Sequence, residues 1–247
     1  MTNNHLTENA AHIKFREEKI NSNKKIAKIV GVLFIIGTAA GIMSLPAAGS
    51  IVHATDYLVK LAENKNRVIL GALFTLIMGI SLSMIPVVLF PIFKKYNEAL
   101  ALGAIIFRGA LEMLTYMGIA SSWLLLLTLS QKYGSAGTTE APDFQLMGAM
   151  LLDVENRVTN MLDIVFSIGA LFVYYLFYKT KLIPTWLSLW GLIGAILYLA
   201  YPILFMFSFD IGILQLPLAL QEMIMAGLLI VKGFNSCSTV SGSDNRI

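Results

Sequence analysis

Six long apolar segments, separated by shorter polar stretches, follow one another along the chain. They cover residues 26–45, 67–93, 99–130, 146–178, 184–209 and 213–231. A bilayer core about 30 Å thick is crossed by roughly 20 helical residues, because each residue advances the helix by about 1.5 Å. Each segment is about that long or longer. The pattern therefore predicts an all-α, polytopic integral membrane protein with six transmembrane helices.

The stretches between these segments predict how the helices are connected. In residues 53–66, apolar and charged positions alternate at near-helical spacing, which predicts a short interfacial helix. Residues 131–145 contain glycines and a proline and lack apolar periodicity, so we expect a loop there. Residues 179–183 leave room only for a tight antiparallel turn.

Three regions of different composition follow from this pattern. Residues 1–25 form a polar N-terminal segment, residues 26–233 form the membrane domain, and residues 234–247 form a polar tail that we expect to be disordered. The first apolar segment is longer than the apolar part of a cleaved signal peptide, which has about 7–15 residues. We therefore expect an uncleaved first helix.

Composition supports the membrane class and narrows the partners. Of the 247 residues, 57% are hydrophobic and 13% are charged, whereas charged residues make up about 25% of soluble domains. The net charge is only +3, and the basic residues cluster beside the apolar segments. This distribution favours the lipid bilayer over nucleic acid as the partner. The single cysteine, Cys237, excludes an intrachain disulfide.

The positions of lysine and arginine predict the orientation of the helices, because basic residues are enriched on the cytoplasmic side of membrane proteins. With the N-terminus inside, the cytoplasmic side holds Lys24, Lys25, Lys28, Lys94, Lys95, Lys179, Lys181 and Lys232. The outer connections then hold only Lys60, Lys65, Arg67 and Lys132. We therefore expect both termini in the cytoplasm, which requires an even number of spans.

Three charged residues within the apolar segments are candidates for a polar site, because ionisable groups inside a bilayer are costly and normally face a protein interior or water. Glu222 lies ten residues before the lysine that ends the sixth segment, hence roughly 15 Å from the cytoplasmic face. Arg108 has nearly the same depth in the third segment, and Glu112, four residues on, shares its helical face. We expect Arg108 and Glu222 to pair. The alternative is a third span that begins near Gly109 and leaves Arg108 at the inner surface.

A polar stripe runs along the fourth segment. Asn156, Asn160, Asp163 and Ser167 are spaced by four, three and four residues, which places them on one face of a helix. Counting about 20 residues back from Lys179 puts Asp163 inside the membrane. We expect the stripe to line a cavity that opens outward. The alternative is that Asn160 and Asp163 only bind a neighbouring helix by hydrogen bonds.

No catalytic, nucleotide or metal motif stands beside these residues. The patterns GxSxG, HExxH and GKS/T do not occur. The three histidines, His5, His12 and His53, are too far apart in the predicted topology to form a ligand set, so we expect no metal and no cofactor. His53 is expected at the surface.

Aromatic residues, glycines and prolines predict details of packing. The aromatic residues near the inner ends of the fourth and fifth segments, expected to be membrane anchors, are Tyr174, Tyr175, Tyr178, Trp186 and Trp190. Gly37 and Gly41 form the one GxxxG pair, which permits close helix approach. The prolines expected to kink their helices are Pro86, Pro91, Pro202 and Pro217.

Two short motifs resemble a known family. They are the run LIPTWLSLWG at residues 182–191 and the run RGALE from Arg108 to Glu112. In these motifs, and over roughly residues 26–233, the chain resembles a family of uncharacterised bacterial membrane proteins, domain of unknown function 4386. It departs from the expected pattern at Thr185, where we expect a basic residue. The resemblance implies a six-helix core in a bacterial plasma membrane and implies no activity.

Three hypotheses for function remain open. The leading one is binding or movement of a small polar or amphiphilic solute through a cavity lined by Arg108, Glu112, Asn160, Asp163 and Glu222. The second is a non-catalytic membrane component that associates with partner proteins, its buried charges fixing helix register. The third is an intramembrane enzyme that acts on a lipid, with Glu222 or Asp163 as acid or base. No nucleophile or metal set accompanies these carboxylates, so the enzyme hypothesis comes last.

Overall fold

The computed structural model describes the backbone of residues 2–134 and 141–235, and the side chains within these ranges from residue 21 onward. All regular structure in these ranges is helical. Six helical spans are long and apolar enough to cross a membrane, and they are Asn21–Val52, Lys65–Phe93, Glu98–Tyr133, Ala141–Thr180, Thr185–Met206 and Gly212–Val231. The predicted all-α membrane class and the predicted six spans are therefore confirmed.

Several spans are built from more than one helical element. The elements are α1 (Thr2–Ser44), η1 (Leu45–Gly49), α2 (Ser50–Val52), α3 (Tyr57–Glu63), α4 (Lys65–Phe93), α5 (Glu98–Ala104), η2 (Ile105–Leu111), α6 (Glu112–Tyr133), α7 (Ala141–Thr180), α8 (Thr185–Met206), η3 (Gly212–Gln215) and α9 (Leu216–Val231). The elements η1 and η2 are π-helical, and η3 is a 3₁₀-helix. The third span is therefore a helix in which a π-helical section, η2, joins α5 to α6.

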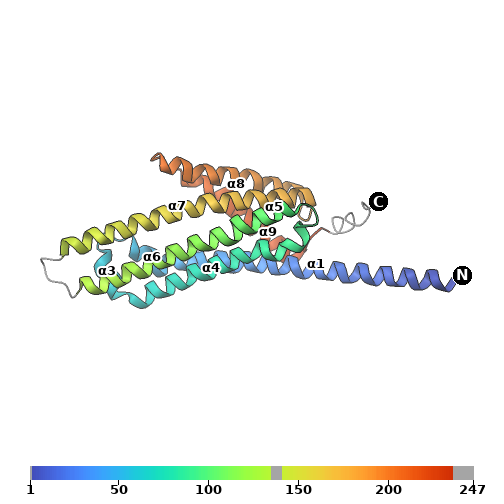
Figure 1. Ribbon diagram of the computed structural model, residues 1–247, viewed down its shortest axis with the longest axis horizontal. Helices are drawn as coiled ribbons and strands as arrows, with labels where there is room; N and C mark the ends of the chain where they lie inside the picture. The colour runs from blue at the N-terminus through green and yellow to red at the C-terminus, as the bar shows by residue number, and fades with distance from the viewer. Residues whose placement is uncertain (1, 135–140, 236–247) are drawn as a thin grey trace.

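The spanning helices run along the long axis of the molecule (Figure 1), and their contacts close a ring in chain order. Each one packs against the next, from α1 to α4, α6, α7, α8 and α9, and α9 packs against α1. Short connections favour such antiparallel neighbours. The ring gives every spanning helix one face toward the inside and one face toward the surroundings.

The two faces of α1 illustrate this division. Ala27, Val30 and Phe34 are buried, whereas Ile29 and Ile36 are exposed. The exposed positions are as apolar as the buried ones, which suits a surface covered by lipid tails.

Close approach between α1 and α4 depends on the GxxxG pair. A Cβ atom on Gly37 would lie 2.7 Å from the side chain of Leu82, and one on Gly41 would lie 2.5 Å from the sulfur of Met78. A larger side chain at either position would force the side chain of Leu82 or Met78 to move, so Gly37 and Gly41 have the packing role expected for them.

The connection between the third and fourth spans is shorter than expected. A loop was predicted for residues 131–145, but α6 continues to Tyr133 and α7 begins at Ala141. Pro142 lies in the first turn of α7, where a missing N–H costs no helical hydrogen bond. Residues 135–140, the middle of the predicted loop, lie outside the described residues.

The helix predicted within residues 53–66 exists as α3, but its apolar face is turned toward protein. Leu58 and Leu61 are buried, and the carbonyl of Leu58 accepts a hydrogen bond from the hydroxyl of Ser130 in α6. Part of the apolar face of α3, which we expected to contact lipid, therefore packs against α6.

Pro217 does not interrupt a helix, contrary to the expected kink. It occupies the first turn of α9, whereas Pro86, Pro91 and Pro202 lie inside α4 and α8. At the other end of α9, Phe234 is buried and Asn235 donates hydrogen bonds to the carbonyls of residues 181 and 182. Residues 236–247, the rest of the expected tail, lie outside the described residues.

Candidate functional site

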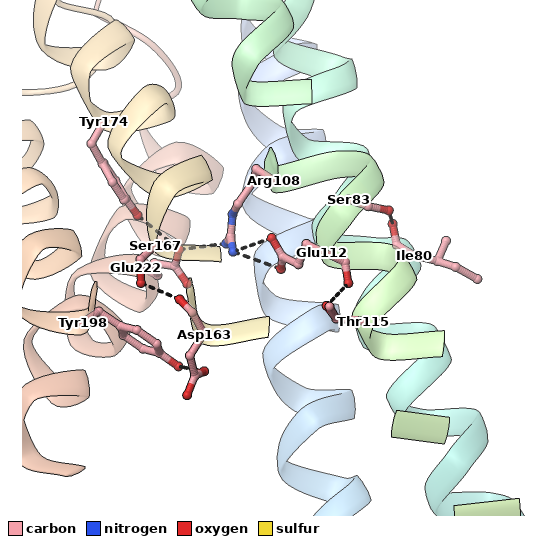
Figure 2. A network of polar contacts seen from close by, with 10 residues as sticks. All are labelled: Ile80, Ser83, Arg108, Glu112, Thr115, Asp163, Ser167, Tyr174, Tyr198 and Glu222. Atoms are coloured by element: carbon pink, nitrogen blue, oxygen red, sulfur yellow. Dashed lines mark hydrogen bonds and ion pairs between the residues drawn. The ribbon is translucent and has the colours of Figure 1, made fainter. Parts of the chain in front are cut away.

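Arg108 lies inside the ring and donates hydrogen bonds to carboxylates of two spanning segments. The residue is in the π-helical section η2 and is 1% exposed. Its Nη1 donates to both carboxylate oxygens of Glu112 at 3.0 Å, and its Nη2 donates to Oε1 of Glu222 at 2.9 Å (Figure 2). Single π-helical turns are frequent at functional sites. The expected pairing of Arg108 with Glu222 is confirmed, and the alternative of an arginine at the inner surface is wrong.

The fourth span completes the surroundings of this cluster. Tyr174 of α7 donates its hydroxyl proton to Oε1 of Glu222 at 3.3 Å. The ring of Phe166, also on α7, lies with its centroid 4.1 Å from the central carbon of the Arg108 guanidinium, a cation–π contact. We call Arg108, Glu112, Glu222, Tyr174 and Phe166 the arginine cluster.

Two glycines allow the helices around the arginine cluster to come together. A Cβ atom on Gly169 of α7 would lie 2.6 Å from the backbone nitrogen of Arg108. A Cβ atom on Gly191 of α8 would lie 2.3 Å from the ring of Tyr174. Neither position can hold a larger residue unless the backbone or a ring moves, so the arginine cluster depends on both glycines.

The arginine cluster is sealed and carries unequal charge. The side chains of Arg108, Glu112 and Glu222 are 2%, 0% and 11% exposed. Within the described part of the chain, Arg108 is the only cation in an ion pair with either carboxylate. Buried charges are tolerated when they are paired and hydrogen-bonded. One guanidinium serving two carboxylates leaves one negative charge in excess when all three groups are ionised.

Asp163 of α7 forms a second polar group beside the arginine cluster. Its Oδ1 accepts a hydrogen bond from the hydroxyl of Tyr198 on α8, and its Oδ2 accepts one from Nε2 of Gln215 in η3, each at 3.2 Å. The residue is partly exposed. Figure 2 shows the Asp163 carboxylate directed toward Tyr198 and away from Arg108. The two donors come from separate elements, so Asp163 connects α7, α8 and η3.

The residues of the predicted polar stripe have different surroundings. Asn156 is exposed, and the Ser167 hydroxyl donates to the backbone carbonyl of Asp163 at 2.6 Å. Asn160, by contrast, has a buried Oδ1 that accepts no hydrogen bond. Asn160 and Asp163 are three residues apart on one helix face, a spacing that brings side chains together. We call these two residues the acceptor face.

Sequence reasoning missed four residues that complete these groups. Tyr174 was expected to anchor the helix at the membrane surface, but it is 1% exposed and contacts Glu222. Phe166, Tyr198 and Gln215 carried no signal, because an aromatic residue or a glutamine in an apolar segment is equally compatible with packing. The four side chains could be found only once the neighbouring helices were known.

A separate contact occurs near the other end of α7. Glu155 of α7 is 4% exposed. Its Oε2 lies 3.7 Å from Nε2 of His53, whose side chain is 50% exposed. The expected surface position of His53 is confirmed. Among the described residues, no three side chains of His, Cys, Asp and Glu gather as metal ligands.

Comparison with known proteins identifies the family. One family, described as a domain of unknown function (DUF4386), matches residues 29–233. The chain belongs to this family. The match covers all six spans apart from residues 21–28 of the first one, and it includes both motifs on which the resemblance rested. No curated protein matches the chain, and no solved structure does. The role of the arginine cluster and of the acceptor face in this DUF4386 chain must therefore be inferred from their geometry.

Proposed function

We propose that this DUF4386 protein binds a small polar or amphiphilic solute at the acceptor face. The observation that carries the proposal is the state of Asp163. It is a partly exposed carboxylate with two neutral donors and, in the described part of the chain, no ion pair. Polar groups within a spanning segment are costly and normally have a functional reason.

We also propose that the protein lies in a bacterial plasma membrane with both termini in the cytoplasm. Lys94, Lys179 and Lys232 directly follow or end α4, α7 and α9, and Lys24 of α1 lies against Gly233. These lysines support a cytoplasmic side at that end of the ring.

Depth along the helices then assigns different roles to the two groups. By helical rise, Arg108 lies roughly 15 Å and Asp163 roughly 24 Å from the inner boundary of a 30 Å core. Asp163 is therefore the part of the polar network closer to the outside. The sealed arginine cluster fixes the helices, and the acceptor face exchanges its neutral hydrogen bonds for contacts with the solute. Each such bond is worth only about 0.5–1.5 kcal/mol.

Accessibility of the acceptor face tests the proposal. In a Cys237→Ser background, Asn160→Cys is reconstituted into vesicles and treated with a membrane-impermeant thiol reagent. The control is Ile193→Cys on α8, because Ile193 is 60% exposed and we expect it to face lipid. We expect modification of Asn160→Cys to be at least about tenfold faster, because a site that admits a solute from the outside also admits water, whereas the lipid-facing surface does not.

A panel of solutes then tests binding itself. Amines, carboxylic acids, sugars and alcohols are added before the thiol reagent, and a solute that binds the acceptor face slows modification of Asn160→Cys. If Asn160→Cys reacts as slowly as Ile193→Cys, or if no solute slows it, solute binding at this face is wrong.

One observation favours a second function, that of a non-catalytic membrane component that associates with partner proteins. The arginine cluster is almost completely sealed, as expected of charges that only fix helix register. An unreactive Asn160→Cys would support this alternative.

A further inference from the structure

The ring interior holds more carboxylates than cations. The arginine cluster contributes Arg108, Glu112 and Glu222, and the acceptor face adds Asp163. When all four groups are ionised, negative charges exceed positive charges by two. Within the described ranges, Asp163 has no basic partner. An uncompensated carboxylate in a low-dielectric interior attracts positive charge strongly.

The hydrogen-bonding capacity of the acceptor face also favours a ligand that carries donors or positive charge. An ionised carboxylate only accepts hydrogen bonds, and an amide oxygen also accepts. Asp163 has two neutral donors, and each carboxylate oxygen can accept a second bond. The Oδ1 of Asn160 is buried and has no donor at all. A ligand that satisfies both residues must therefore bring donors or positive charge, not acceptors.

Aromatic rings line the same region. Phe166 and Tyr198 lie with their ring centroids 4.7 Å apart, and Tyr198 also contacts Asp163. The faces of such rings attract cations. Phe166 already carries one, the guanidinium of Arg108 at 4.1 Å. Tyr198 is the ring next to Asp163 without a cation contact among the described residues.

We propose that the solute is an organic cation, an amine or quaternary ammonium compound with an apolar body. Its charged group binds Asp163 and Asn160 beside the ring of Tyr198, and its apolar body faces the spanning helices. This inference rests on the proposed function and names the class of its solute. An anion of the same shape is rejected, because at the acceptor face it meets two acceptors and, among the residues that the structure describes, no cation in contact with Asp163.

The inference is tested with the full chain in nanodiscs of phosphatidylcholine. Binding of radiolabelled tetraphenylphosphonium is measured by equilibrium dialysis against empty nanodiscs, and tetramethylammonium, tetraethylammonium and tetraphenylborate are the competitors. We expect saturable binding with a Kd below about 1 mM, competition by the ammonium compounds, and no competition by the anion.

Variants connect this binding to Asp163. We expect Asp163→Asn to weaken binding by about tenfold or more, as for loss of a charge-assisted contact, and Asp163→Glu to retain much of it. The matched control is Asp153→Asn on the same helix, since Asp153 is 62% exposed and already paired with Arg157. It should bind like the wild type. If Asp163→Asn does not fold, Asn160→Leu removes the unpartnered acceptor and should weaken binding several-fold.

The outcomes separate this inference from the proposed function. If Asp163→Asn binds tetraphenylphosphonium as well as the wild type, or if no cation binds while a neutral or anionic solute protects Asn160→Cys, the cationic ligand is wrong and solute binding stands. If no cation binds and no solute protects Asn160→Cys, both are wrong.

Discussion

Arg108 donates a hydrogen bond to Glu222 at 2.9 Å although the two residues are 114 positions apart in the chain. This contact joins the third span to the sixth across the interior of the ring. It is not an isolated pair, because the same guanidinium also binds Glu112. Neutralising any one of these three residues therefore changes the electrostatic energy of the other two.

The first prediction concerns the stability of this cluster. Arg108→Met leaves two buried carboxylates without a cation and should lower the free energy of unfolding by about 3–5 kcal/mol. Glu222→Gln leaves Arg108 paired with Glu112, so its cost should be smaller, about 1–3 kcal/mol. Both values are measured by denaturant unfolding of the purified protein in detergent.

A combined variant shows whether the cost comes from unpaired charge. Adding Glu112→Gln and Glu222→Gln to Arg108→Met removes every charge of the cluster and should recover much of the lost stability. The exposed pair of Arg157 and Asp153 is the control, and Arg157→Met should cost about 0–1 kcal/mol. Strict additivity of the single changes would contradict a coupled cluster.

The second prediction uses a glycine that holds two helices together. Gly169→Ala would place a Cβ atom 2.6 Å from the backbone nitrogen of Arg108, and the resulting displacement should cost about 1–3 kcal/mol. Gly227→Ala in α9 is the control, because a Cβ atom there meets nothing within 4 Å. That change should be neutral or stabilising, since alanine favours a helix over glycine by about 1 kcal/mol. Equal thermal stability of the two variants would show that Gly169 is not required for close packing.

The sequence specified which residues share a depth, because depth follows from the rise of a helix. Counting residues from the lysines was enough to place Arg108 and Glu222 at one level, and their contact followed from the cost of an unpaired charge. The same reasoning predicted six spans, since length and apolar composition are properties of single segments. Ends of helices were less certain, because Ala141 to Gln145 continue α7 beyond the apolar pattern.

Rotation of a helix about its axis could not be predicted in the same way. Tyr174 and Tyr175 are neighbours in an aromatic group, yet Tyr174 is buried against Glu222 and Tyr175 is 38% exposed. Which of the two faces inward depends on contacts such as that of Gly191 with Tyr174, which appear only when the helices are assembled. For the same reason, the donors to Asp163 could not be found in segments far along the chain.

The third prediction follows from that difference between adjacent tyrosines. Tyr174→Phe removes only the hydroxyl group that donates to Glu222, and loss of one buried hydrogen bond should cost about 0.5–1.5 kcal/mol. Tyr175→Phe, one position away and partly exposed, should leave the thermal unfolding temperature unchanged. A larger effect at Tyr175 than at Tyr174 would be inconsistent with the rotation of α7.

The last prediction concerns orientation in the cell. Lysines flank the helices mainly at one end of the ring, and basic residues are retained on the cytoplasmic side. The end of α6 and the start of α7 lie at the opposite end of the ring (Figure 1), so we expect the segment that joins them to be outside. In intact cells, Ser135→Cys in a Cys237→Ser background should react with an impermeant thiol reagent, and the native Cys237 should react only after the membrane is opened. The Cys237→Ser protein without a new cysteine is the control for background labelling. If Ser135→Cys were protected while Cys237 reacted in intact cells, the acceptor face would be nearer the cytoplasm, and the proposed solute would have to enter from inside.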